Sequence, residues 1–297
     1  MTFIEKLRSV WPDLHIVENA PMAKHTSFHI GGPATIVSPK NCKELVEVYR
    51  YCIRNDERPL ILGAGTNILA PDAGLTRIVL CTKGLVAVKD LGDGVLEAEC
   101  GITMARLACY ARDLSLSGLE FAAGIPGTVG GGVYMNAGAY GGEMAQVVVK
   151  TQALLPDGDL CEIEGEAHAF SYRHSVFEDR EAVILKTQVK LQQADKDVIT
   201  ERMRELARKR STSQPLDMPS AGSTFKRPVG GYAAALIDAA GLKGKGVGAA
   251  AVSQKHAGFV VNLGGATAQD VMQTMRYIQE RVYETSGILL EPEVRIW

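Results

Sequence analysis

The sequence lacks a long apolar stretch and a strong excess of either charge. No segment of its 297 residues approaches the ~20 consecutive apolar residues that a membrane-spanning helix requires. The first residues also lack the apolar run of a signal peptide. The net charge is only -2, which indicates no nucleic-acid or other polyanion surface. These absences predict a cytoplasmic protein with neither membrane nor nucleic acid as a partner, and a monomer is the default expectation.

Metal-binding and disulfide patterns are also absent. The six cysteines form no Cys-x-x-Cys pair, so we expect buried small side chains in a reducing compartment. His25 and His29 have i, i+4 spacing, but the alternating pattern around them predicts a strand. On a strand this spacing spans roughly 13 Å, which is too far for one ion. We therefore predict no metal site.

Neither common nucleotide-binding motif is complete. Gly63-Ala64-Gly65 follows an apolar strand, but Ile68 stands where the dinucleotide fingerprint needs its third glycine. No Gly-Lys-Ser/Thr sequence occurs, which excludes a Walker loop.

What the chain does have is glycine: there are 31 glycine residues, and three loops are rich in glycine or contain a Gly-Ser turn. The longest is the glycine-rich run 124–142, and the others are 63–67 and 221–226. Glycine lets backbone N–H groups approach a ligand closely, and successive N–H groups form a concave anion site. Three such loops favour a large, phosphorylated ligand over plain turns.

Apolar periodicity predicts a mixed α+β chain of two or three units, without the strict alternation of a doubly wound sheet. We expect strands at 25–30, 34–37, 59–62, 76–81, 85–89, 95–100, 147–155, 182–191 and 257–261. We expect helices at 41–52, 103–114, 197–210 and 232–240, and one that begins after Thr267 and ends at Gly287.

Read in order, the polar and glycine-rich segments resemble those of the UDP-N-acetylenolpyruvoylglucosamine reductase family, in its shorter variety that lacks an extra loop near the substrate. The matching segments cover nearly the whole chain: 25–32, 63–67, 124–131, 171–177, 214–215, 221–228, 253–262 and 291–295. The resemblance implies an FAD-binding fold of the vanillyl-alcohol-oxidase type (PCMH type), made of two α+β subdomains, with a C-terminal α+β substrate-binding domain. The implied division is 1–83, completed by 291–297, then 84–192 and 193–290.

The resemblance implies an NADPH-dependent flavoenzyme that reduces an enolpyruvyl UDP-sugar to UDP-N-acetylmuramate for peptidoglycan synthesis. It implies three catalytic residues. Arg173 suits a carboxylate because a guanidinium is permanently charged and bidentate, although a surface ion pair with Glu178 or Asp179 is the plainer interpretation. Ser223 is the implied proton donor, although Gly-Ser alone usually marks a turn. Glu293 is preferred over Glu291, which is two residues away and on the same strand face.

The same resemblance implies the binding residues. FAD, held without a covalent bond, is expected to contact Leu62, Gly63, Ala64, Gly65, Thr66, Asn67, Ile68, Ala123, Gly124, Ile125, Pro126, Gly127, Thr128, Gly130, Gly131, Asn136 and Ala137. Asn67 is expected to add a side-chain bond to the pyrophosphate. The expected substrate contacts are Tyr134, Lys226, Gln254 and His256, although His256 is equally consistent with a core histidine.

Two alternatives stay open at this point. One is a flavin oxidase or dehydrogenase of the same fold acting on another sugar or alcohol. Many of those enzymes tether FAD through a His or Cys, and neither residue occurs in 63–67 or 124–136. The other is a nucleotide-binding regulator without turnover, which a colourless protein that takes up no FAD would favour.

Overall fold

The computed structural model describes all 297 residues. They form two compact units, each described here by itself. Unit 1 comprises Met1–Glu18, Thr35–Ala64 and Arg77–Arg208; unit 2 comprises Asn19–Ala34, Gly65–Thr76 and Lys209–Trp297. The segments 84–192 and most of 1–83, expected as separate subdomains, thus lie together in unit 1, while 19–34 and 65–76 join the C-terminal residues.

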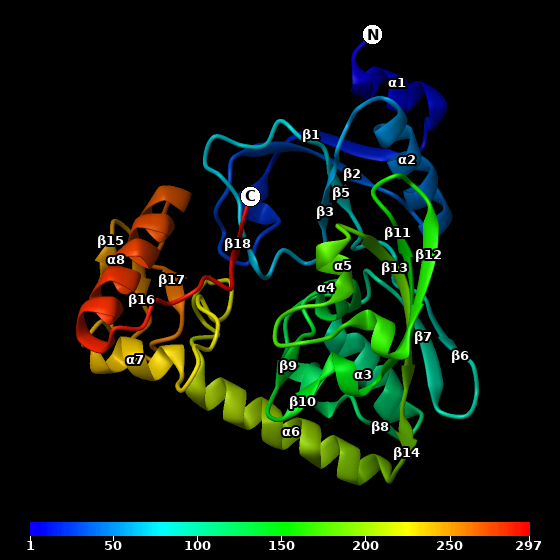
Figure 1. Cartoon of the computed structure of the whole chain (residues 1–297). Coiled ribbons are helices and arrows are strands. Elements are labelled where there is room, and N and C mark those ends of the chain that lie inside the picture. The colour runs from blue at the N-terminus through cyan, green and yellow to red at the C-terminus, as the bar shows by residue number, and fades with distance from the viewer. The chain divides into compact units, whose positions relative to one another are not determined.

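Unit 1 is built on an antiparallel sheet in the order β12-β11-β13-β7-β6 (Figure 1). A second sheet has the order β1-β2-β5-β3, in which β2, β5 and β3 run parallel. The strands are β1 (His15–Pro21), β2 (Pro33–Ser38), β3 (Leu60–Leu62), β5 (Val79–Cys81), β6 (Val88–Asp90), β7 (Val95–Glu99), β8 (Leu116–Ser117), β9 (Gly138–Ala139), β10 (Gly142–Glu143), β11 (Val148–Leu154), β12 (Leu160–Glu164), β13 (Val183–Lys190) and β14 (Gln192–Gln193).

Two of the predicted helices of unit 1 begin with a side-chain cap. Asn41 accepts a hydrogen bond from the amide of Glu44 (2.9 Å), and Thr103 accepts one from the amide of Arg106 (3.2 Å). Each bond satisfies an amide that has no partner inside its helix. The α-helices are α1 (Phe3–Val10), α2 (Cys42–Arg54), α3 (Met104–Asp113), α4 (Val129–Tyr134), α5 (Val176–Asp179) and α6 (Lys196–Ser213), whose last residues belong to unit 2.

The glycine-rich run contains a short helix, α4, that we did not predict from the sequence. Thr128 begins it, and α4 packs on β13. A Cβ atom at Gly130 would lie 2.8 Å from Cβ of Cys100, and one at Gly132 would lie 2.6 Å from Sδ of Met104. Part of the glycine content therefore serves close packing of α4 on the unit 1 core.

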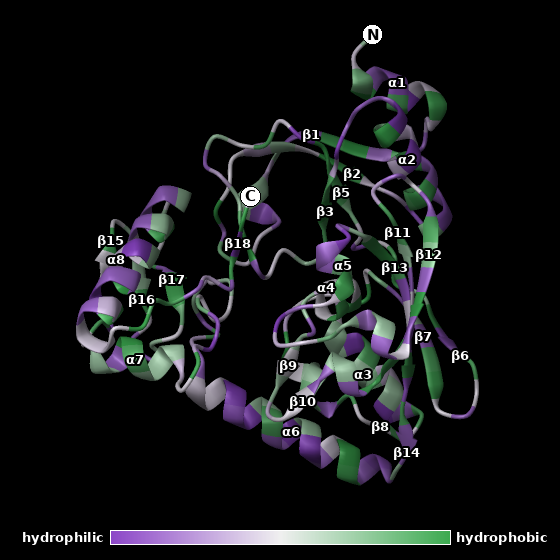
Figure 2. Cartoon of the chain, viewed as in Figure 1, coloured by the Kyte–Doolittle hydropathy of each residue, from purple (hydrophilic) through white to green (hydrophobic).

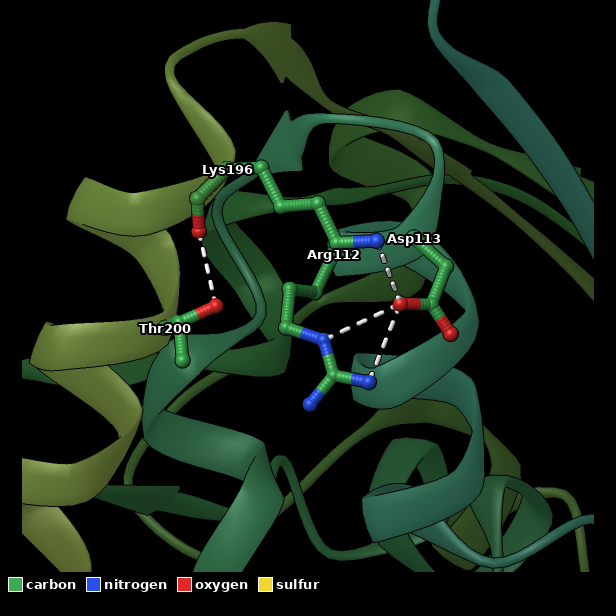
Figure 3. Close-up of polar contacts among 4 residues, drawn as sticks. All are labelled: Arg112, Asp113, Lys196 and Thr200. Atoms are coloured by element: carbon green, nitrogen blue, oxygen red, sulfur yellow. Dashed lines mark hydrogen bonds and ion pairs between the residues drawn. The ribbon is translucent and has the colours of Figure 1, made fainter.

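The start of α6 is fixed to the end of α3 by polar contacts (Figure 3). Asp113 lies 3.1 Å from the Lys196 ammonium and 3.0 Å from the Arg112 guanidinium, and Thr200 donates to the Lys196 carbonyl. These hydrogen bonds lower the pKa of Asp113, that from Lys196 most. The rest of α6 is largely hydrophilic (Figure 2), with only Ile199 and Leu206 buried.

Unit 2 packs α8 (Ala268–Ser286) against β15 (Gly246–Val247), β16 (Ala250–Val252) and β17 (Val260–Asn262). As predicted, Thr267 and Asp270 form a capping box and Gly287 ends the helix with φ 69°. The predicted inner face is also confirmed, because Val271, Met275, Ile278 and Val282 are all buried. The remaining elements are the 3₁₀ helix at Met22–Lys24, α7 (Ala233–Ala239), β4 (Ile68–Leu69) and β18 (Arg295–Ile296).

The strand predicted at 25–30 is wrong. His25–Ile30 forms turns, and His29 has the left-handed φ of 56°. Thr26 donates its hydroxyl to the Ile30 carbonyl (2.9 Å), which folds the segment back on itself. Polar and apolar residues alternate here because Phe28 and Ile30 enter the unit 2 core, so the pattern mimicked a strand. Because this segment is not a strand, the strand spacing used to argue against a metal at His25 and His29 does not apply. No group of three His, Cys, Asp or Glu residues is placed to hold an ion.

The chain contains no helix that is both long and apolar enough to cross a membrane.

Candidate functional site

The loop after β3 leaves its backbone amides open. No hydrogen bond of the protein has the amide of Gly63, Ala64 or Gly65 as its donor. The carbonyl just before the loop is occupied, since the Leu62 oxygen accepts from the amide of Thr82 (2.9 Å). Leu62 is itself fully buried in the core. The loop thus offers successive backbone donors, as an anion requires.

A second set of open amides lies beside those of Gly63 and Ala64 in unit 1. The amides of Gly127 and Thr128 also donate to no protein acceptor, whereas those of Val129 and Gly130 donate to Ile102 and Cys100 (2.8 and 2.9 Å). A Cβ atom at Gly63 would lie 2.5 Å from Oγ1 of Thr128, so the two loops approach as closely as glycine allows. The arrangement fits the diphosphate of a dinucleotide such as FAD, which needs converging N–H donors and no side chain in the way.

The other residues predicted to contact a cofactor lie around these amides or in the core beneath them. Ala123, Ile125 and Ala137 are partly buried and pack against the unit 1 core, as does Tyr134, which was predicted to contact the substrate. Gly124, Pro126 and Gly131 are exposed, while Thr66 and Ile68 are partly buried in unit 2.

Arg173 lies on a tight turn in unit 1. Ser171 and His174 pair through both backbone hydrogen bonds (3.1 and 3.2 Å), and Arg173 has φ 58°. Its guanidinium stacks over the Tyr172 ring at 4.9 Å and donates to the Gly138 carbonyl (3.4 Å). The neighbouring His174 contacts Asp179 (2.9 Å).

Ser223 and Glu293 are brought together in unit 2 by Thr224. The amide of Glu293 donates to the Thr224 carbonyl (2.8 Å), while the Thr224 amide donates to the carbonyl of Gly258 (2.8 Å). The buried Thr224 hydroxyl accepts from the amide of Val260 (2.9 Å). Thr224 therefore joins three segments, and Ser223 immediately precedes it. Sequence reasoning missed Thr224, because no spacing distinguishes it from its neighbours in the motif.

Glu291 and Glu293 have different surroundings. Glu291 is exposed and its carboxylate pairs with the Lys226 ammonium. Oε2 of Glu293 is shielded from solvent. A shielded carboxylate is better suited to a catalytic role than one that is solvated and paired, which favours Glu293 as the sequence did.

Asn67 is bonded to the segment that carries Glu293. Its side-chain amide donates to the Glu293 carbonyl (3.1 Å), and its own carbonyl accepts from the Arg295 amide (3.0 Å). Strands β4 and β18 continue this pairing in parallel, which joins the C-terminal residues to the 1–83 segment. The side-chain donor expected for a pyrophosphate is thus used within the protein.

His256 and Gln254 occupy one turn of unit 2. Nδ1 of His256 accepts from the Gly258 amide (3.1 Å), which places the proton of the neutral ring on Nε2. No hydrogen bond of the protein involves Nε2, so that donor is available to a ligand. Burial lowers the pKa of His256, and Lys243 adds to the shift. Gln254 is exposed, with its amide against Gly244.

Family models match both parts of the chain. Residues 33–164 match the FAD binding domain, and residues 214–297 match the C-terminal domain of UDP-N-acetylenolpyruvoylglucosamine reductase. The predicted mixed α+β fold, with an FAD-binding part and a distinct C-terminal domain, is confirmed.

Proteins named UDP-N-acetylenolpyruvoylglucosamine reductase match over nearly their full length. That of Caldanaerobacter subterraneus subsp. tengcongensis is 42% identical over 99% of this chain and 97% of its own. That of Syntrophomonas wolfei is 41% identical over 96% of both chains. The crystal structure of the Thermus caldophilus reductase superimposes with a TM-score of 0.83 at 33% identity, covering 96% of this chain and 99% of that one.

Proposed function

This chain belongs to the UDP-N-acetylenolpyruvoylglucosamine reductase family, and we propose that it reduces the enolpyruvyl UDP-sugar with NADPH as the reductant and Ser223 as the proton donor. It is an FAD-dependent oxidoreductase of peptidoglycan precursor synthesis, in preference to an oxidase of the same fold or a regulator without turnover. FAD, when bound, would supply the hydride chemistry, with NADPH as the source of the hydride and the methylene carbon of the substrate as its acceptor. The chain's residues must then stabilise negative charge at the neighbouring carbon and its carboxylate, and supply one proton.

Arg173 is proposed to hold the substrate carboxylate. A guanidinium forms two parallel hydrogen bonds to a carboxylate and keeps its charge at any working pH. Charge that develops next to the carboxylate is stabilised by a donor already in place. The left-handed turn and the contacts with Tyr172 and Gly138 fix the base of this side chain in advance.

Ser223 is proposed to deliver the proton, with Glu293 beside it. The observation that carries this assignment is the backbone pairing of Thr224 with Glu293, which fixes the two side chains' attachment points in one layer of unit 2. Serine is a weak acid, so its proton transfer needs neighbouring groups that stabilise the change in charge. Glu293 is proposed to orient a water molecule or the enol form of the substrate by a hydrogen bond.

The binding residues follow from the open donors. The unit 1 amides of Gly63, Ala64, Gly127 and Thr128 are proposed to hold the FAD diphosphate. The other residues predicted to contact FAD keep that proposed role, except Asn136, which is treated below. Lys226, the Nε2 donor of His256, Gln254 and Tyr134 are proposed to bind the substrate. NADPH is proposed to use the same site in turn, because it too carries a nucleotide diphosphate.

We further propose a cytoplasmic location and a monomeric enzyme. All six cysteines are free thiols, as suits a reducing compartment.

Rapid mixing tests the proposed function. Protein reduced by NADPH without oxygen is mixed with the enolpyruvyl sugar, and flavin absorbance is followed. We expect oxidised flavin to return with one UDP-N-acetylmuramate formed per flavin. Reoxidation only by oxygen, with no sugar product, would support the oxidase instead; a protein that binds no FAD would support the regulator.

A further inference from the structure

We infer that Asn136 is a positioning residue for Arg173 and that its side chain does not bind the cofactor. The inference rests on the proposed role of Arg173 and concerns only residues of unit 1. It revises the expectation, drawn from resemblance, that Asn136 is a cofactor ligand.

The first observation is that the Asn136 side chain is buried and hydrogen-bonded within the protein at both its nitrogen and its oxygen. Only 1% of the residue is exposed. Its Nδ2 donates to the Ser171 carbonyl (3.0 Å), and its Oδ1 accepts from the amide of Ala145 (2.9 Å). A buried amide engaged at both ends has little to offer a ligand, and breaking either bond would leave a buried polar group unsatisfied.

The second observation is where those bonds lead. Ser171 is the first residue of the turn that carries Arg173, and it pairs with His174 at the other end through backbone hydrogen bonds in both directions. Holding the Ser171 carbonyl therefore holds both ends of the turn. Arg173 lies between them in the left-handed region, so its backbone direction depends on the turn staying closed.

Two further bonds run from the same turn to the same part of the glycine-rich run. The buried Ser175 hydroxyl donates to the Tyr134 carbonyl (2.8 Å), and Arg173 donates to Gly138 (3.4 Å). Asn136 lies between these two acceptors. The run 134–138 and the turn 171–175 thus form one assembly, with Asn136 as its buried centre.

The backbone of Asn136 explains the choice of residue. Its φ is 41°, in the left-handed region that asparagine tolerates better than most residues. A longer side chain such as glutamine would carry its amide nitrogen and oxygen one carbon farther from the backbone. A displacement of ~1 Å can lower the rate of a catalysed step 10²-fold. Loosening this assembly should therefore slow the step that uses Arg173 and leave the other half-reaction unchanged.

The test compares Asn136→Gly, which tolerates the left-handed backbone but removes both bonds, with Asn19→Gly as a matched control. Asn19 also has a left-handed φ (54°) but is exposed. FAD content, the rate of flavin reduction by NADPH and the rate of flavin oxidation by the enolpyruvyl sugar are measured on each holoenzyme. Asn136→Asp serves as a second variant, since it retains an acceptor for Ala145 but replaces the donor to Ser171 with an oxygen that carries charge when ionised.

We expect both Asn136 variants to retain FAD and flavin reduction within about 2-fold and to slow oxidation by the sugar by about 10- to 100-fold. Asn19→Gly should change neither rate. In an Arg173→Lys background, Asn136→Gly should cost less than about 3-fold further, because the two residues act as one. Equal slowing of both half-reactions, loss of FAD, or additive effects with Arg173→Lys would overturn the inference. If Arg173→Lys alone leaves oxidation unchanged, the proposed role of Arg173 fails and the inference fails with it.

Discussion

The two units hold their catalytic candidates in different ways. In unit 1, side chains of Asn136 and Ser175 bind the turn of Arg173 to the glycine-rich run. In unit 2, backbone pairing through Thr224 and β18 positions Ser223 and Glu293, and side chains add to it at Asn67 and Thr224. Backbone hydrogen bonds are retained in most substitutions, whereas a side-chain hydrogen bond is lost when its one residue is replaced. We therefore expect the function of unit 1 to be sensitive to substitutions outside its catalytic residue, and that of unit 2 to be sensitive chiefly at Ser223 and Glu293.

The largest effect should come from Ser223→Ala. Removing the proton donor should slow flavin oxidation by the enolpyruvyl sugar by about 10³-fold while NADPH reduces the flavin at an unchanged rate. Rapid mixing measures each half-reaction separately. If both slow to the same degree, Ser223 serves the structure and the unit 2 half of the comparison is wrong.

Arg173→Lys should come next, with a loss of about 100-fold in the same oxidation step and unchanged FAD content. Lysine keeps the charge but loses the planar pair of donors, so the loss measures bidentate binding of the carboxylate. Wild-type turnover in this variant would remove Arg173 from the site.

Thr224→Val tests whether backbone pairing is enough in unit 2. Valine has a similar shape but no acceptor for the buried Val260 amide, which should cost about 1–3 kcal/mol of unfolding free energy. Thr224→Ser, which retains the hydroxyl, serves as the control in urea unfolding. We expect oxidation by the sugar to fall less than about 3-fold, and a loss as large as that of Asn136→Gly would erase the contrast between the units.

A smaller effect is expected on the pH dependence of the unfolding free energy, to which His168 and His256, the two histidines with lowered pKa values, should contribute differently. His168 is fully buried in unit 1: Nδ1 donates to the Gly165 carbonyl (2.9 Å) and Nε2 accepts from the Thr151 hydroxyl (3.0 Å). Burial lowers its pKa, while the bond to Gly165 and the charge of Glu164 oppose the shift. Because the folded pKa is below the unfolded value of about 6.5, the neutral ring stabilises the fold above that pH.

This contribution is lost as the pH falls through the folded pKa of His168. We expect the unfolding free energy of the protein to decline between pH 7 and 5, and His168→Gln to make that decline shallower. His256→Gln should also make it shallower, by less, because His256 is only partly buried. An equal slope in the wild type and His168→Gln would contradict the assignment.

Local signals predicted most of the fold. The caps at Asn41 and Thr267 act within three residues, so the sequence indicated them directly. The cap at Thr103 was not predicted, although the helix that it begins was. The alternation at 25–30 misled because it came from two core contacts and not from a strand. Hydrogen bonds between residues far apart in the chain had no signal in the sequence. For example, Asp72 accepts from the amides of Ala268 and Gln269 at the start of α8.

For the candidate site, too, the sequence indicated some features and left others undetermined. The motifs located the glycine loops and the three catalytic candidates, and the open amides of Gly63 and Gly127 agree with the exposed backbone that glycine indicates. The sequence did not distinguish glycines that serve a ligand from those that serve packing, because Gly130 and Gly132 depend on where Cys100 and Met104 lie. Nor did it distinguish an asparagine that binds a ligand from one that binds the backbone.

The FAD affinity of Gly63→Ala tests the account's central claim most directly. The added Cβ would lie 2.5 Å from Thr128 Oγ1, which caps α4 and cannot move without losing that bond, so the loop and its amides must shift. Gly84→Ala is the control, since its Cβ would lie 3.4 Å from the Pro39 carbonyl. We predict that Gly63→Ala weakens FAD binding by at least about 10-fold in a fluorescence titration while Gly84→Ala does not. Equal FAD affinity in Gly63→Ala and the wild type would contradict the claim that these amides hold the cofactor.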